Sequence, residues 1–519
     1  MKTQYISILI VSIFFLVSCE SEFESSVEDN EAYRTGEADF SNFVSLGNSL
    51  TAGFADNALY LESQEFSYPN ILAQQFSLVS DLEFTQPLMA DNVGGLLLNG
   101  NPIPGFGPRL VLSTQSGSPF PAPLSGNPQT DISNVVPGPI NNLGVPGAKS
   151  FHLGLNGYGN ISNVGTTANP YFVRFASTPN ASMIEDAVAQ SPSFFSLWIG
   201  NNDVLSYATS GGTGTDQTGN LDPTTYASND ITDPSLFAGV YDSYVNALTS
   251  SASGGVLYNI ADVTSIPFFT TVPNNALVLD AETAASLTGF FQAVAGILTQ
   301  SLIAQGVPAA QAQALASQYA ITFNEGPNRF LIDTAVTPTN PLGFRQMTED
   351  ELLLLTIDQG ALAQGYGSVI LTPEVLQVLG ILQQGGTPTP EQAQLVINAV
   401  SGIDDADALD TSELSAISNA RMAYNAVIES TAMNNGLAFV DVDQLLLDSQ
   451  NGVPFDGGVM TSEFVTGGAF SLDAVHLTPR GYAYIANATI QAINETYGST
   501  LPTVNLGDYR TVPTSDNTQ

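Results

Sequence analysis

Cationic side chains are scarce in this chain. Of its 519 residues, 10 are Lys or Arg and 49 are Asp or Glu, which gives a formal net charge of −39. A protein with this charge is repelled by phosphate backbones and by anionic lipid headgroups. The composition therefore excludes nucleic-acid binding. No EF-hand pattern is present, and we interpret the acidity as a solvating surface rather than as calcium sites.

Cysteine and histidine are also nearly missing. The single cysteine, Cys19, excludes an internal disulfide. The two histidines, His152 and His476, lie far apart in the sequence and do not supply the ligands of a zinc site. No glycine motif for phosphate or dinucleotide binding stands in a suitable context. We expect no metal and no other cofactor, and the choice of a histidine general base is between two residues.

Only one long hydrophobic run is present, from Ile6 to Val17. It is too short to span a bilayer comfortably and has the length of a secretory signal. It ends in Leu16-Val17-Ser18-Cys19, which resembles the lipobox of bacterial lipoproteins. The resemblance implies a signal peptide at residues 1–18 that is removed, and a lipid anchor on the thiol of Cys19.

Residues 19–38 form an acidic stretch that is poor in apolar side chains and is typical of a flexible tether. The stretch is similar to the acidic leader that follows the lipidated cysteine in surface-exposed lipoproteins of the Bacteroidetes. This similarity implies that the protein is held in the outer membrane by its lipid and faces outward.

Short apolar segments that alternate with helical patterns predict an α/β fold. A parallel sheet of such strands is covered on both faces, and its sites lie in the loops after the carboxyl ends of the strands. Helices are expected to begin at Asp233-Pro234 and at Asp410, where Glu413 completes a capping box. The expected strands are Phe43–Leu46, Phe194–Ile199, Val256–Ile260 and Leu437–Val440.

Two insertions interrupt the folded domain expected at residues 39–519. Residues 76–140 are rich in Gly, Pro and Asn and predict a long ordered loop system. Residues 275–410 predict a helical insertion, either a subdomain that packs on itself or an apolar lid or acyl-binding wall. The helix starts expected within it are Asp280, Thr348 with Glu351, Thr372-Pro373, and Thr389 with Gln392. Residues 511–519 are expected to form a frayed tail.

Four short blocks follow one another along the chain, and the last contains Asp473 three residues before His476. That spacing allows the carboxylate to contact the imidazole. The blocks are Gly47-Asn48-Ser49-Leu50, Asn142-Leu143-Gly144-Val145-Pro146-Gly147, Gly200-Asn201-Asn202-Asp203 and Asp473-Ala474-Val475-His476. Together they resemble the four blocks of the GDSL or SGNH hydrolases, which implies a three-layer α/β/α core.

The resemblance assigns a role to each block. Ser49 becomes the nucleophile, His476 its general base, and Asp473 the residue that orients His476. The oxyanion would be bound by the backbone amides of Ser49 and Gly147 and by the side chain of Asn202. We expect Asp203 to brace its loop, His152 to have a packing or hydrogen-bonding role, and Asn48, which replaces the family's Asp, to leave the triad complete.

These roles imply serine-dependent hydrolysis of carboxylic esters through an acyl-enzyme at Ser49. The substrate would be a small-molecule or lipid ester, with acyl lipids favoured by the apolar insertion. Deacetylation of polysaccharides, lysophospholipase activity and thioesterase activity are further possibilities within this class. The alternative is a surface lipoprotein that keeps a hydrolase-like fold but only binds a ligand or partner.

Overall fold

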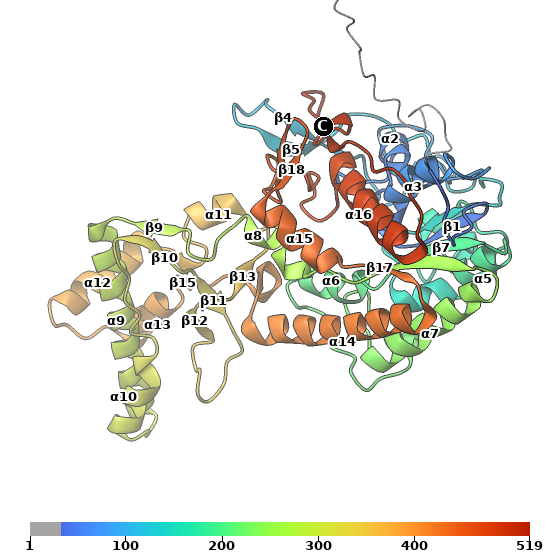
Figure 1. Cartoon of the computed structure of the whole chain (residues 1–519). Helices are drawn as coiled ribbons and strands as arrows, with labels where there is room; N and C mark the ends of the chain where they lie inside the picture. Colours follow the sequence, from blue (N-terminus) through green and yellow to red (C-terminus); the bar gives the residue numbers. More distant parts are fainter. Residues whose placement is uncertain (1–32) are drawn as a thin grey trace, which may run out of the picture.

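The computed structural model describes residues 33–519 (Figure 1). The expected signal peptide, Cys19 and the first part of the tether lie outside the described residues. The end of the expected tether belongs to the fold, since the backbone N–H of Arg34 donates to Thr500 and that of Glu37 donates to the carbonyl of Tyr497. Among the described residues, the fold thus includes positions before residue 39.

A five-stranded parallel sheet forms the centre of a mixed α/β fold, as the sequence predicts. All four expected strands are present, and the sheet gains a fifth, β6, from the second sequence block. In order across the sheet, the strands are β17 (Ala438–Val440), β8 (Gly254–Tyr258), β7 (Phe194–Trp198), β1 (Phe43–Gly47) and β6 (Asn142–Gly144).

Helices cover both faces of this sheet and create two hydrophobic cores. Alternate residues of β1 face opposite sides: Phe43 packs in one core, and Val44 and Leu46 pack in the other. The first core includes α3 (Tyr68–Phe76) and α16 (Pro479–Tyr497), and the second includes α5 (Met183–Val188), α6 (Asn202–Thr209), α7 (Pro234–Thr249) and α14 (Thr411–Asn435). The core of the molecule therefore has three layers (Figure 1).

The insertion at 275–410 forms a lobe that projects from one side of the core (Figure 1). It packs on itself around a separate hydrophobic cluster that includes Phe290, Phe291 and Val294. The helical insertion expected from the sequence contains five helices, and four small antiparallel strand pairs lie among them. The helices are α9 (Ala281–Ala304), α10 (Ala309–Ser317), α11 (Gln359–Ala363), α12 (Pro373–Gln383) and α13 (Pro390–Ile397). The strand pairs are β9 (Leu277–Leu279) with β10 (Gly326–Asn328), β11 (Leu331–Asp333) with β12 (Phe344–Gln346), β13 (Leu352–Leu353) with β16 (Ala408–Leu409), and β14 (Ser368–Val369) with β15 (Val400–Ser401).

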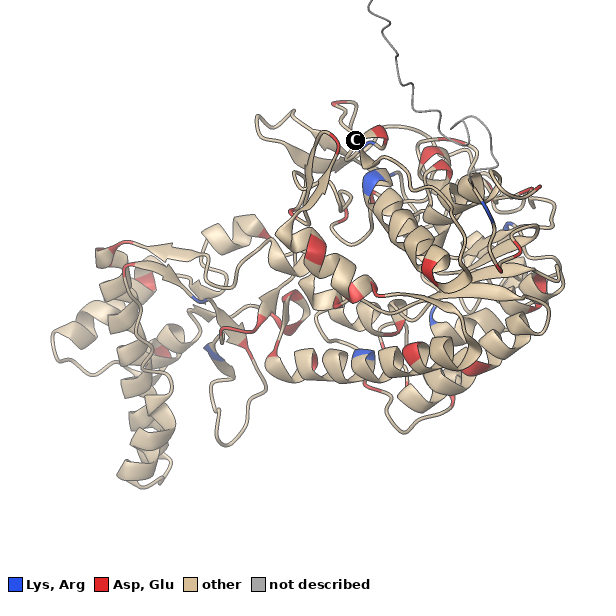
Figure 2. Cartoon of the chain, in the orientation of Figure 1, with Lys and Arg blue, Asp and Glu red and all other residues tan. Residues whose placement is uncertain are grey.

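Charge is unevenly distributed between the core and the lobe. Asp and Glu are spread over the core, whereas α9 and α10 are almost free of charge (Figure 2). No charged residue occurs between Glu282 and Glu325. Helix α9 is long and apolar enough to cross a membrane by length and composition, yet its largest side chains pack within the lobe.

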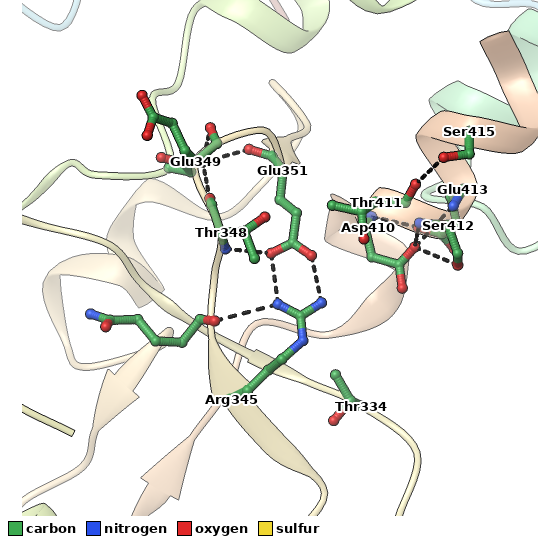
Figure 3. Close-up of polar contacts among 12 residues, drawn as sticks. Thr334, Arg345, Thr348, Glu349, Glu351, Asp410, Thr411, Ser412, Glu413 and Ser415 are labelled. Atoms are coloured by element: carbon green, nitrogen blue, oxygen red, sulfur yellow. Dashed lines mark hydrogen bonds and ion pairs between the residues drawn. The ribbon is translucent and has the colours of Figure 1, made fainter. Parts of the chain in front are cut away.

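The capping pattern of Thr348 and Glu351 does not begin a helix (Figure 3). Glu351 does accept a hydrogen bond from the backbone N–H of Thr348, at 2.7 Å, as in a capping box. Its buried carboxylate also pairs with both terminal nitrogens of Arg345 on β12, and the next residues form strand β13. An ion pair to Arg345, six residues earlier, and pairing with the distant strand β16 thus replace the helix that the local pattern favours.

The loop-rich insertion at 76–140 is ordered by two hairpins and by the C-terminal segment. The hairpins are β2 (Leu97–Leu98) with β3 (Asn101–Pro102) and β4 (Leu110–Ser113) with β5 (Phe120–Pro123). Leu112 exchanges backbone hydrogen bonds with Pro513 and Ser515, and Gln519 donates to Pro123. The expectation of a frayed tail at 511–519 is therefore wrong.

Candidate active site

A tight turn after β1 presents Ser49 at the start of helix α1 (Ser49–Ala52). The turn requires Gly47, because a Cβ atom there would lie 2.4 Å from the carbonyl oxygen of Trp198. Asn48 caps α1: its Oδ1 atom accepts from the N–H of Leu50 at 3.0 Å, and its Nδ2 donates to Asn201 at 3.2 Å. An asparagine at this position thus holds the loops of the first and third blocks together.

The structure brings Ser49, His476 and Asp473 together, although 424 positions separate Ser49 from Asp473 in the sequence. The Nε2 atom of His476 lies 2.8 Å from the Oγ atom of Ser49. Its Nδ1 atom lies 2.9 Å from an oxygen of Asp473. An ionised carboxylate can only accept, so Nδ1 carries the imidazole proton and Nε2 is left to accept the serine proton.

A local turn sets the three-residue spacing between Asp473 and His476. Ala474 has a φ of 61°, and the backbone N–H groups of Val475 and His476 both donate to the Oδ1 atom of Asp473. Burial acts to raise the pKa of Asp473, but the charge of His476 and the hydrogen bonds from His476 and Val475 outweigh it, so the pKa lies below its usual value. Asp473 is consequently a fixed anion that can stabilise a protonated His476.

The three expected oxyanion donors come from loops that follow three adjacent strands, β1, β6 and β7. Gly147 has a φ of 82°, and a Cβ atom there would meet open space apart from Asn169. Within residues 33–519, the N–H groups of Ser49 and Gly147 have no hydrogen-bond acceptor. Gly144 is different, because its N–H donates to Asn142 and a Cβ would collide with Ala52.

The third block contributes one side chain to the site and one to its support. Asn202 begins α6, lines the cavity beside Ser49, and donates from Nδ2 to the carbonyl of Ala148 at 2.9 Å. Asp203 points elsewhere: its buried carboxylate accepts from the N–H and the hydroxyl of Ser150. Burial raises the pKa of Asp203, and its bonds brace the loop that carries Gly147.

His152 is not part of the site. Its Nδ1 atom accepts from the N–H of Lys149 at 3.0 Å, and its ring stacks on Tyr158 with 4.6 Å between the ring centres. Burial, aided by the nearby charge of Lys149, lowers the pKa of His152 to about 3. A neutral, stacked imidazole fits the packing role expected from the sequence.

An apolar cavity opens beside Ser49 and His476. Its walls come from the core of the fold: α6, the loop after β8, α15 (Val442–Asn451) and α16. No described residue of the lobe lines it, so the lobe does not form the wall of this cavity. Its apolar lining includes Trp198, Leu205, Val263, Ile266, Leu445, Leu446, Phe470, Val475 and Tyr484.

Several residues around the site were not expected from the sequence. The ring of Phe54 lies 4.6 Å from the ring of His476, and Ser471 donates its hydroxyl to Asp473 at 3.0 Å. The turn Asp56-Asn57 also reaches Asp473, through the N–H of Asn57 at 2.9 Å. The adjacent Asp56-Asn57 pair is a sequence signal for this turn, because both residue types tolerate the left-handed backbone conformation.

Within residues 33–519, no group of three or more His, Cys, Asp or Glu side chains could hold a metal ion. Comparisons with protein-family models, with curated proteins and with solved structures each found no match. Chemically, the site places a serine hydroxyl, an imidazole and a carboxylate in one hydrogen-bonded chain, an arrangement in which an imidazole can take the proton of a serine.

Proposed function

We propose that the protein is a serine hydrolase of carboxylic esters, of the GDSL or SGNH type, that forms an acyl-enzyme at Ser49. The observation that carries this proposal is the continuous hydrogen-bonded chain from Ser49 through His476 to Asp473. An isolated serine hydroxyl is a poor nucleophile until a neighbouring base takes its proton.

The first half of the reaction acylates the serine. As the Oγ atom of Ser49 forms a bond to the ester carbonyl carbon, its proton passes to Nε2 of His476, and Asp473 stabilises the resulting imidazolium. The negative charge on the carbonyl oxygen is bound by the N–H groups of Ser49 and Gly147 and the side chain of Asn202. The bond from carbon to the alcohol oxygen then breaks, and the alcohol leaves with the proton from His476.

The second half repeats the same steps with water as the nucleophile. His476 takes a proton from water, the hydroxide oxygen bonds to the acyl carbon, and the bond to Ser49 breaks. The proton returns to the Oγ atom of Ser49, and a carboxylic acid is released. Every proton is accounted for by His476, so no cofactor is required by this scheme.

The apolar lining of the cavity supports substrates with an apolar acyl group, including small-molecule and lipid esters. This support comes from α6, α15 and α16, whereas the sequence pointed to the lobe. A lipid anchor on Cys19 and an outward-facing position in the outer membrane are part of the same proposal, and they rest on the sequence.

The test compares the mature chain with its Ser49→Ala variant on chromogenic esters from acetyl to palmitoyl. We expect turnover that is lost in Ser49→Ala and kept in Ser415→Ala, which changes an exposed serine of α14 outside the site. A serine-reactive fluorophosphonate should label the unchanged protein and the Ser415 variant only. A folded protein that is inert to both reagents would favour the ligand-binding lipoprotein instead.

A further inference from the structure

A strained turn lies between the nucleophile and the acid–base loop. Ala55 and Ala58 exchange both of their backbone hydrogen bonds, at 3.1 and 3.0 Å, and close a two-residue turn. The two residues within it, Asp56 and Asn57, have φ angles of 53° and 62°. Non-glycine residues adopt this conformation at a cost, and such residues persist where the surrounding contacts hold them.

The turn makes three hydrogen bonds to the segment Ser471–Asp473. The N–H of Asp56 donates to the hydroxyl oxygen of Ser471 at 2.9 Å, and the N–H of Asn57 donates to Asp473 at 2.9 Å. In the opposite direction, the N–H of Leu472 donates to the carboxylate of Asp56 at 3.1 Å. The hydroxyl of Ser471 in turn donates a hydrogen bond to the other oxygen of Asp473. Both oxygens of the triad carboxylate are thereby fixed from the turn.

Further hydrogen bonds hold the carboxylate of Asp56 in place. Its second oxygen accepts from the hydroxyl of Tyr60 at 2.7 Å, and that hydroxyl accepts from Arg510 at 3.1 Å. Arg510 also pairs with Glu62 at 2.8 Å. Asp56 is 1% exposed and Tyr60 is fully buried. Asp56 does not line the cavity beside Ser49, so substrate has no access to it there.

We propose that Asp56 is a positioning residue, which clamps Ser471–Asp473 to the turn after α1 and so fixes Asp473 and His476 relative to Ser49. The inference rests on the proposed function for its kinetic consequence, but the geometry that it describes does not depend on turnover. Tyr60 supports the same clamp, and Arg510 supports Tyr60 from the C-terminal segment.

The geometry explains why a carboxylate stands here. Two donors, the N–H of Leu472 and the hydroxyl of Tyr60, point at two different oxygens of Asp56. The side chain of asparagine has the same shape but only one acceptor oxygen. Glycine has no side-chain acceptor, and it readily adopts the left-handed backbone conformation. Asp56→Asn therefore weakens the clamp, and Asp56→Gly removes its side-chain part without a new backbone clash.

The experiment measures kcat and KM separately for Asp56→Gly, Asp56→Asn and Tyr60→Phe in the mature chain. Displacing a catalytic group by a fraction of an ångström to an ångström costs up to about a hundredfold in rate. We expect kcat to fall by about 10- to 100-fold in Asp56→Gly, less in the other two variants, with KM changed by less than about twofold. The matched control is Asp131→Gly, which removes a loop carboxylate that accepts from Gly100 and Ser133 and has no contact with the triad.

A second measurement of the clamp does not depend on ester hydrolysis. The proton on Nδ1 of His476, bonded to Asp473, gives a far-downfield proton resonance in NMR spectra. We expect this resonance to shift or broaden in Asp56→Gly and to stay in place in Asp131→Gly, including in a Ser49→Ala background. If the protein hydrolyses no ester, the proposed function fails while this measurement still tests the clamp.

If Asp56→Gly folds, two outcomes would overturn the inference. One is an Asp56→Gly protein with unchanged kcat and an unchanged Nδ1 resonance. The other is an equal loss of kcat in Asp131→Gly, which would show a general effect of loop stability. If Asp56→Gly does not fold, unchanged values in both Asp56→Asn and Tyr60→Phe overturn the inference.

Discussion

Asn202 donates a hydrogen bond from Nδ2 to the carbonyl oxygen of Ala148, next to Gly147. This bond ties the third sequence block to the second and fixes the side-chain amide in the cavity beside Ser49. The second hydrogen on Nδ2 remains to bind an oxyanion. One contact therefore orients the Asn202 amide and anchors the loop that carries Gly147.

Asn202→Ala is expected to lower kcat for short esters by about 10²- to 10³-fold, because one preorganised donor to the developing oxyanion is lost. KM should change little, since the donor acts mainly in the transition state. Steady-state kinetics on an acetyl ester provide the measurement. Asn246→Ala, at an exposed position of α7, is the control. A loss below threefold in Asn202→Ala would remove Asn202 from the oxyanion site.

Asp473→Asn tests the tautomer argument. An asparagine can direct its NH2 group at Nδ1 of His476 and so move the imidazole proton to Nε2, where it can no longer accept from Ser49. We expect a fall in kcat of about 10⁴-fold with little change in the fold. Circular dichroism checks the fold, and an Asp473→Asn protein that keeps a tenth of its kcat would contradict the proposed role.

The sequence predicts the core of the fold well because its signals there are local. The strands at Phe43 and Phe194 are short apolar runs that end at glycine, and the helix beginning after Asp410 starts at a complete capping box. In each case the local preference agrees with the tertiary structure. The geometry of Ser49, Asp473 and His476 also agrees with the roles that their four blocks imply.

The lobe shows where such local reasoning is insufficient. Thr348 and Glu351 carry the same capping pattern as Asp410 and Glu413, but Arg345 lies opposite Glu351 and β16 lies beside the following residues (Figure 3). Neither neighbour can be recognised from the pattern alone. The clamp formed by Asp56 could not be predicted from the sequence for a similar reason, since its partner Leu472 is 416 positions away.

The cavity beside Ser49 gives a prediction about substrate length. Leu445 lines this cavity from α15, whereas Leu447 on the same helix is 47% exposed and does not line it. Leu445→Trp should occupy part of the cavity and lower kcat/KM for palmitoyl esters at least tenfold relative to acetyl esters. Leu447→Trp should leave the ratio unchanged. An unchanged ratio in both variants would mean that the acyl chain binds elsewhere.

Glu413 gives a prediction about stability and pH. It lies at the start of α14, where burial, followed by the charges of Asp405, Asp410 and Glu351, raises its pKa to about 7 from 4.5. The folded state thus binds the proton more tightly than the unfolded state does. Between pH 4.5 and 7 the unfolded chain loses this proton first, so the contribution of Glu413 to the free energy of unfolding falls as pH rises.

Glu413→Gln keeps an acceptor for the N–H of Asp410, which Glu413 bonds at 2.7 Å, and removes the titration. Urea unfolding at pH 5, 6 and 7 should therefore show the variant gaining stability relative to the unchanged protein as pH rises. Glu429→Gln, at an exposed position of the same helix, should show no such trend. A constant difference between Glu413→Gln and the unchanged protein across this range would mean that Glu413 titrates alike in the folded and unfolded chain, and that the acidic neighbours at the base of the lobe do not act on it.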